Sequence, residues 1–128
     1  MLLLDSAPVI YYFENHPKFA DHYEPLFSAQ TAGALRFAVT PITIAEVLTG
    51  PLRLGNDATA RRYLAILRSW EFVGLTIDIA ERAARLRASL PLKLPDAIQV
   101  ASALAIDAAA LVTADRELSK LRSLRVIS

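Results

Sequence analysis

The chain has 128 residues, 54% of them hydrophobic and 21% charged, so it is expected to form one globular domain over residues 1–128 with a sizeable core. Its 14 Lys and Arg residues nearly balance 13 Asp and Glu, and a net charge of +1 excludes a protein that coats duplex nucleic acid through a general positive charge. The absence of cysteine excludes disulfides, thiolate zinc sites and cysteine nucleophiles, and it fits a reducing compartment.

Nothing in the sequence indicates a membrane protein. No apolar run reaches the ~20 residues that a membrane-spanning helix needs, and Asp5 interrupts the apolar N-terminal stretch without a preceding Lys or Arg. A secretory signal is therefore not expected, and the predicted location is cytoplasmic.

Short apolar runs alternate with segments of helical periodicity, which predicts an α/β fold with a mostly parallel five-stranded sheet flanked by helices. The predicted strands are residues 2–4, 37–40, 73–77, 110–113 and 125–127. Amphipathic helices are expected near residues 19–27, 60–70 and 79–90, and Trp70 is expected in the core. Residues 97–108 have few polar side chains, which predicts a helix buried nearly all round. The segment from Gly50 to Asn56 is expected to be the most mobile connection.

Four acidic residues, Asp5, Glu46, Asp96 and Asp115, follow predicted strands or begin predicted helices. Each has a local structural explanation. Asp5 and Asp115 could cap the helices that follow them, and Asp96 could interact with a helix dipole. Glu46, with Thr43, matches the T-x-x-E capping box.

Together these acids indicate more than helix capping. The carboxyl ends of parallel strands form the ligand crevice of such folds, so acids at these ends are expected to meet there. Two carboxylates ~4 Å apart repel by about 4 kcal/mol at an effective dielectric of 20, so a cluster needs a cation or raised pKa values. An oxygen-only ligand set, without cysteine and without His16 and His22 on one helical face, favours Mg²⁺ or Mn²⁺.

The segments that contain these acids resemble, in order along the whole chain, four motifs of PIN-domain proteins, specifically the VapC-type toxins of toxin–antitoxin pairs. The segments are residues 2–6, 37–48, 94–98 and 111–115. Two residues differ from the pattern of this family. Many relatives have a small hydroxyl or amide residue where this chain has Ala7, and an aspartate where it has Glu117.

The resemblance implies a parallel sheet of order 3-2-1-4-5 and a metal-dependent endoribonuclease that uses Mg²⁺, with Mn²⁺ as a possible substitute. It also implies an RNA substrate, a cognate VapB-type antitoxin and a homodimer. The metal-binding and catalytic residues would be Asp5, Glu46, Asp96 and Asp115, with Ser6 and Thr113 in supporting positions.

Three alternatives remain open from the residues alone. A non-catalytic PIN-fold binding module would keep the acids for stability or partner recognition. A structure-specific DNA nuclease would use the same metal and acids. A phosphoryl-accepting receiver domain has similar length and layering, but it normally has an acidic pair after the first strand, where this chain has Ser6 and Ala7 after Asp5.

Overall fold

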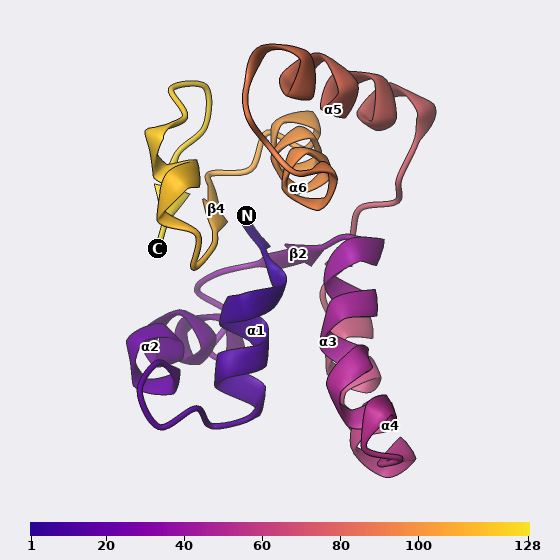
Figure 1. Cartoon of the computed structure of the whole chain (residues 1–128). Helices are drawn as coiled ribbons and strands as arrows, with labels where there is room; N and C mark the ends of the chain where they lie inside the picture. Colours follow the sequence, from indigo (N-terminus) through magenta and orange to yellow (C-terminus); the bar gives the residue numbers. More distant parts are fainter.

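Strand β1 lies at the centre of a five-stranded parallel sheet with the order β3-β2-β1-β4-β5 in the computed structural model, which describes residues 1–128 (Figure 1). The strands are β1 Leu2–Leu4, β2 Phe37–Val39, β3 Glu71–Phe72, β4 Ala110–Val112 and β5 Val126–Ile127. The helices are α1 Ser6–Phe13, α2 Ala20–Thr31, α3 Pro41–Arg53, α4 Asp57–Arg68, α5 Ile77–Ser89, α6 Leu94–Ala105 and the 3-10 helix η1 Arg116–Lys120. The predicted fold class and strand order are confirmed.

The strand order reverses at β1, since the chain adds β2 and β3 on one side of it and β4 and β5 on the other. Leu4 pairs with Val112 at the ends of β1 and β4. The next residues of both strands therefore emerge side by side at the switch point, where open parallel sheets bind ligands.

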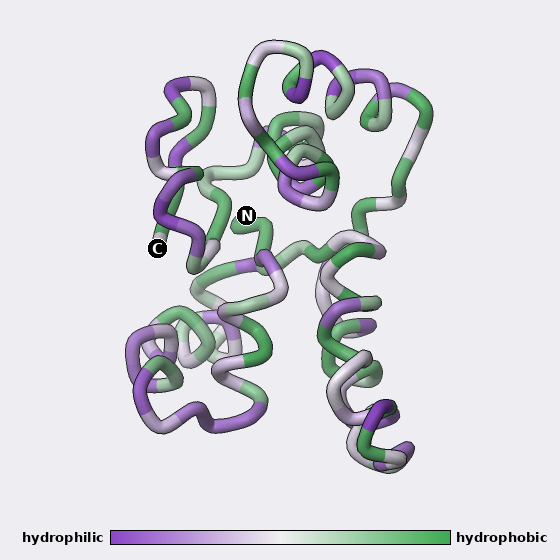
Figure 2. Tube along the Cα trace, viewed as in Figure 1, coloured by the Kyte–Doolittle hydropathy of each residue, from purple (hydrophilic) through white to green (hydrophobic).

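Each face of the sheet has its own hydrophobic core, which explains why the central strands are apolar at every position. Leu3 and Leu111 face the core formed with α5 and α6, whereas Leu4 and Val112 face the core formed with α1, α2 and α4. Trp70 lies in the second core, as predicted, with its ring 5.2 Å from that of Phe37. Figure 2 shows hydrophobic residues along the strands and hydrophilic residues on the outer turns of the helices.

Helix α6 is buried nearly all round, as predicted, because α5 packs on one side of it and the sheet on the other. Every residue from Ala97 to Ala103 is buried. No helix of the protein combines the length and the apolar character needed to cross a membrane.

The predicted strand at residues 73–77 is wrong. The third strand is Glu71–Phe72, and Ile77 already begins α5. Thr76 caps that helix by accepting a hydrogen bond from the backbone N–H of Ile79 at 3.2 Å. Thr76 and Ile77 thus belong to a helix N-terminus, where a threonine cap decides the local structure. Val73 still follows β3, and its backbone N–H donates to the carbonyl oxygen of Val39 at 2.9 Å.

The segment from Gly50 to Asn56 is also more ordered than predicted. Helix α3 continues through Gly50 and Pro51 to Arg53, and Asn56 caps α4 through the backbone N–H of Thr59. Pro51 is buried, so tertiary packing outweighs its low helix propensity. The connection between α3 and α4 is limited to residues 54–56.

Candidate active site

Asp5 lies at the switch point, half-buried, directly after β1. Its Oδ1 caps α1 by accepting from the backbone N–H of Ser6 at 2.9 Å, which confirms the predicted cap. The same oxygen accepts from Nε2 of Gln99 at 3.1 Å, and Oδ2 accepts from the hydroxyl of Thr113 at 2.8 Å. A carboxylate has about four acceptor positions, so three protein donors leave one free.

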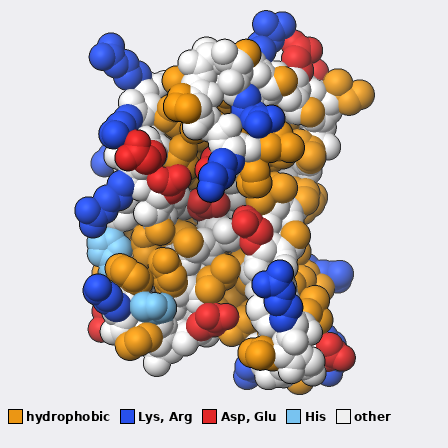
Figure 3. Space-filling view, in the orientation of Figure 1, with side chains coloured by type: hydrophobic (Ala, Val, Ile, Leu, Met, Phe, Trp, Pro, Cys, Tyr) orange, Lys and Arg blue, Asp and Glu red, His pale blue; other side chains and the backbone are white.

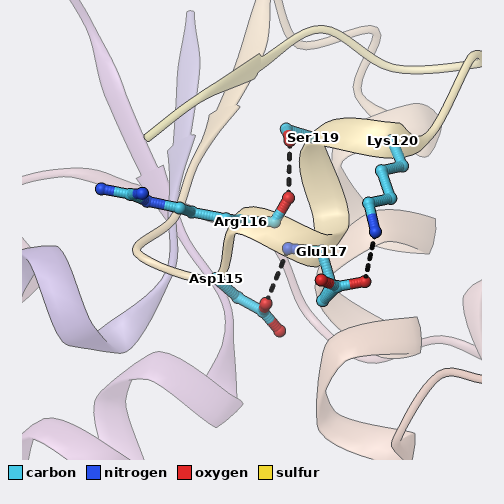
Figure 4. Close-up of polar contacts among 5 residues, drawn as sticks. All are labelled: Asp115, Arg116, Glu117, Ser119 and Lys120. Carbon is cyan, nitrogen blue, oxygen red and sulfur yellow. Dashed lines mark hydrogen bonds and ion pairs between the residues drawn. The ribbon is translucent and has the colours of Figure 1, made fainter.

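Thr113, which is fully buried, connects Asp5 to Asp115. Its hydroxyl donates to Asp5 and accepts from the backbone N–H of Asp115 at 3.1 Å. Asp115 is exposed and caps η1 by accepting from the backbone N–H of Glu117 at 3.0 Å (Figure 4). The predicted cap is therefore present, and the cap places this second carboxylate at the end of the strand next to β1.

Glu117 forms an ion pair with Lys120 at 2.9 Å between the carboxylate and Nζ (Figure 4). Both side chains are about three-quarters exposed. Its backbone N–H, rather than its carboxylate, makes the contact with Asp115.

The predicted capping box of Thr43 and Glu46 is wrong. Thr40 caps α3, with its hydroxyl accepting from the backbone N–H groups of Ile42 and Thr43 at 3.1 and 3.5 Å. The helix starts earlier than predicted because Pro41 is suited to its first turn. Thr43 is thus already helical, and its hydroxyl donates to the carbonyl oxygen of Leu4 at 2.9 Å.

Glu46 is exposed on α3 and faces the beginning of α1. Its Oε1 accepts a hydrogen bond from the hydroxyl of Ser6 at 3.0 Å. This contact joins two helices that follow neighbouring strands, β1 and β2. Glu46 therefore has no role in capping its own helix and lies beside the residue that follows Asp5.

Gln99, which the sequence predictions did not include in the site, holds these elements together from inside α6. It is fully buried, and its Nε2 donates both to Asp5 and to the hydroxyl of Thr43, the latter at 2.8 Å. Its Oε1 accepts from the hydroxyl of Thr40 at 2.7 Å. Gln99 could have been recognised in the sequence as an amide on a mostly apolar helix, three residues after Asp96. Residues with this spacing lie on the same face of a helix.

Asp96 lies half-buried in the first turn of α6, and the charges of all the other predicted acids affect its pKa. Burial raises its pKa most, and the negative charges of Asp5, Asp115 and Glu46 raise it further, while Lys93 opposes them. The acids predicted from the sequence are thus gathered around one carboxyl group. Figure 3 shows acidic side chains gathered in the middle of one face, with lysine and arginine side chains around them.

The gathered acids are not arranged as a closed cage. No group of three or more acidic or histidine side chains lies close enough together to hold one ion at the same time. The predicted acids are not fully occupied by hydrogen bonds, since Asp5 accepts three from the protein and Glu46 and Asp115 accept one each.

Comparisons with known proteins agree with this architecture. A chain of a toxin–antitoxin complex from Klebsiella pneumoniae is 26% identical, with a TM-score of 0.79 over 100% of this chain and 97% of that one. A chain of the VapBC2 complex from Rickettsia felis, bound to a promoter DNA fragment, is 21% identical, with a TM-score of 0.77 over 98% and 96%. VapC20 from Mycobacterium tuberculosis, described as a toxin that cleaves the sarcin–ricin loop, is 14% identical, with a TM-score of 0.76 over 98% and 99%.

A comparison with curated proteins gives no significant match. The family model for the PIN domain matches residues 2–124, nearly the whole chain. This match includes β1 with Asp5, the α3 helix with Glu46, α6 with Asp96 and the end of β4 with Asp115. The resemblance found in the sequence motifs is therefore confirmed, and the chain belongs to the PIN domain family.

Proposed function

We propose that the chain is a metal-dependent endoribonuclease, the toxin of a type II toxin–antitoxin pair, and that it cleaves RNA phosphodiester bonds with Mg²⁺ or Mn²⁺. The observation that carries the proposal is the gathering of Asp5, Asp115 and Glu46 around the half-buried carboxyl of Asp96 at the switch point. The description of VapC20 as a toxin that cleaves the sarcin–ricin loop supports the same activity for this fold.

The donor set fits a hard divalent cation. All of the available ligands are carboxylate oxygens, and Asp5 keeps one acceptor position free beside its three protein donors. Mg²⁺ is usually held by one or two carboxylates and retains several waters, so it does not require three converging side chains. A cation held here would supply an activated water and stabilise negative charge on the phosphate.

The protein groups prepare this site through position and charge. Thr113 and Gln99 donate to different oxygens of the Asp5 carboxylate, and Ser6 donates to Glu46 from the start of α1. Burial raises the pKa of Asp96 most, and the further rise caused by the neighbouring acids would be relieved by a cation held among them. The apo protein is thus strained electrostatically in favour of metal.

The direct test is cleavage of single-stranded RNA by the purified chain, with Mg²⁺, Mn²⁺ or EDTA, and with DNA of the same sequence as a second substrate. Asp5→Asn keeps the helix cap but removes a charge, so it should abolish cleavage. Asp57→Asn, in the exposed first turn of α4, removes the same charge elsewhere and should leave cleavage unchanged. Metal-independent cleavage, or cleavage retained by Asp5→Asn, would contradict the proposal.

The proposed partners are a VapB-type antitoxin and a second copy of the chain. Similar chains come from toxin–antitoxin and VapBC complexes, which supports the antitoxin.

Self-association is supported by exposed apolar side chains near the edge strand β3, namely Phe72, Leu75 and Ile77. Light scattering should give a dimer mass that Ile77→Asp reduces to a monomer mass, and a monomeric wild type would contradict the homodimer.

A further inference from the structure

A pocket of about 430 Å³ opens beside the proposed catalytic centre, next to Asp115 in the chain. The neighbours of Asp115 in sequence, Ala114 and Arg116, form one wall of this pocket. The opposite wall comes from α1, α2 and the turn between them, with Lys18 and Phe19 at the turn. None of these wall residues is among the carboxylates of the site.

The pocket is basic, in contrast to the adjacent centre. Lys18 and Arg116 are its positively charged side chains, and no acidic side chain lines it. The ring of His22, which also lines the pocket, is hydrogen-bonded through Nε2 to a main-chain oxygen of Ser128 at 2.8 Å. Figure 3 shows both histidines close to lysine or arginine side chains and to hydrophobic ones, beside the acidic group. A polyanion that places one phosphate among the metal-binding acids would therefore find positive charge at its next position.

The pocket also offers an aromatic surface. Phe19 is 38% exposed, and its ring packs on those of Tyr11 and His16 at 4.9 and 5.0 Å between centroids. Nζ of Lys18 lies 5.8 Å from the centroid of the same ring. A ring supported by other aromatic groups and partly open to solvent is the kind of surface on which single-stranded bases stack.

The turn that carries Lys18 and Phe19 is fixed rather than loose. Nδ1 of His16 accepts hydrogen bonds from the backbone N–H groups of Lys18 and Phe19 at 3.1 and 3.2 Å. The imidazole thus acts as a cap for this turn, in place of the hydroxyl or carboxylate that usually caps a helix. The phenyl ring and the ammonium group are therefore held at the rim of the pocket.

Tyr23 connects the pocket with the catalytic centre. It lines the pocket yet is only 3% exposed, and burial raises the pKa of its hydroxyl, with Tyr11 and Asp5 adding smaller effects in the same direction. Tyr23 therefore lies near enough to Asp5 for that charge to act on its hydroxyl. The two sites are neighbours in space as well as along the η1 segment.

We propose that this pocket binds the nucleotide next to the cleaved phosphodiester, with its base stacked on Phe19 and its phosphate held by Lys18 and Arg116. The inference rests on the proposed ribonuclease function and adds to it a substrate subsite. Stacking tolerates every base, so the subsite contributes affinity and register more than sequence selection.

The phosphate contacts are tested by binding a fluorescein-labelled single-stranded RNA of ten nucleotides to the full chain in EDTA, where no cleavage occurs. Lys18→Gln with Arg116→Gln should lower the slope of log K against log salt concentration by about 0.7, the value for loss of one phosphate contact on a single strand. Arg82→Gln with Arg85→Gln on α5 removes the same charge from a different helix. This control should change the slope by less than half as much.

The stacking contact is tested by Phe19→Leu, which keeps an apolar side chain but removes the ring. The KM for RNA cleavage should rise about tenfold, within the range for loss of one base–aromatic stack, while kcat stays within about twofold. Leu54→Ala, which shortens an apolar side chain that is 85% exposed in the turn after α3, should leave both constants unchanged. Thermal melts should show every variant folded at the assay temperature, because the altered side chains lie at the surface. The largest decrease in melting temperature is expected for Phe19→Leu, which loses the ring contacts with Tyr11 and His16.

The outcomes separate the two proposals. If the wild type neither binds nor cleaves RNA, the proposed function fails and the subsite fails with it. If the wild type cleaves RNA while the pocket variants match their controls in salt slope and KM, the subsite is wrong and the nuclease stands. If those variants keep normal RNA binding but lose antitoxin binding, the pocket belongs to the protein partner and the nucleotide subsite is again wrong.

Discussion

The hydroxyl of Thr113 donates a 2.8 Å hydrogen bond to Oδ2 of Asp5, joining residues 108 positions apart at the ends of β4 and β1. The same hydroxyl accepts from the backbone of Asp115. One buried oxygen thus sets the distance between two of the acids proposed to bind metal. The parallel pairing of Leu4 with Val112 makes this contact possible, because it brings the following residues side by side.

Thr113→Val should therefore destabilise the fold and weaken catalysis together. The change leaves the backbone N–H of Asp115 without its partner and Asp5 with one donor fewer, which costs about 1–3 kcal/mol. Thr113→Ser should recover most of the loss. Thr49→Val, at an exposed hydroxyl on α3, should cost less than ~0.5 kcal/mol in the same urea titration. A Thr113→Val protein as stable and as active as the wild type would show that the hydroxyl is dispensable.

Gln99→Leu is expected to be more damaging than its apolar surroundings suggest. The substitution keeps the volume roughly constant but removes the partners of Thr40, Thr43 and Asp5 at once. Leaving several buried polar groups without partners should lower the free energy of unfolding by about 2–4 kcal/mol.

The control for this prediction is Gln30→Leu, a half-buried glutamine on α2. It should change stability by less than ~1 kcal/mol, because no hydrogen-bond network depends on its side chain. Chemical denaturation monitored by Trp70 fluorescence measures both variants. Equal midpoints for the two leucine variants would contradict a structural role for the Gln99 network.

The layout of the sheet was predictable because it depends on local composition. Buried parallel strands are apolar at every position, so Leu2–Leu4 and the runs near Phe37 and Leu111 could be identified from the sequence. The third strand was misplaced, since it is short and exposed at both positions and lies at an edge of the sheet. Such a strand lacks the apolar signature that revealed the others.

The candidate site was predictable only in part. Acids after strands can be recognised from position, and the structure places Asp5, Glu46 and Asp115 near enough to Asp96 for their charges to raise its pKa. The hydrogen bonds of Gln99 join three separate segments, and no local pattern specifies such a contact. The start of α3 was also misjudged, because Thr40 and Thr43 are both plausible caps and only the position of Pro41 distinguishes them.

Glu46→Gln should abolish toxicity without unfolding the protein. Glu46 is exposed and does not cap α3, so the substitution should change the free energy of unfolding by less than ~0.5 kcal/mol. Expression of the wild type should slow growth. Expression of Glu46→Gln should not, because the negative charge of Glu46 is proposed to contribute to the metal site. Glu14→Gln, at the exposed end of α1, is the matched control and should remain toxic. A fully toxic Glu46→Gln protein would remove Glu46 from the catalytic set.

Asp96→Asn should stabilise the metal-free protein at neutral pH. Burial and the neighbouring acids raise the pKa of Asp96 above its ordinary value of 3.8, so the folded state holds this proton more tightly than the unfolded state does. Stability therefore falls as the pH rises from 3.8 through the raised pKa, and the full penalty is present above it. Asparagine does not titrate, so the melting temperature of the variant should exceed that of the wild type at pH 7, and the difference should shrink as the pH falls through the raised pKa towards 3.8.

Mn²⁺ should reverse the order of the two proteins, because the charge that destabilises the apo site is the charge that would bind the cation. A ligand at a hundredfold excess over its Kd stabilises by about 2.7 kcal/mol, and Asp96→Asn should lose most of this gain. Asp78→Asn, in the exposed first turn of α5, tests whether loss of any helix-start acid has the same effect, and it should melt like the wild type with and without metal. Thermal melts in EDTA and in millimolar Mn²⁺ measure all three proteins. An Asp96→Asn protein with the same Mn²⁺ shift as the wild type would exclude Asp96 as a ligand, even if its apo stability rises as expected.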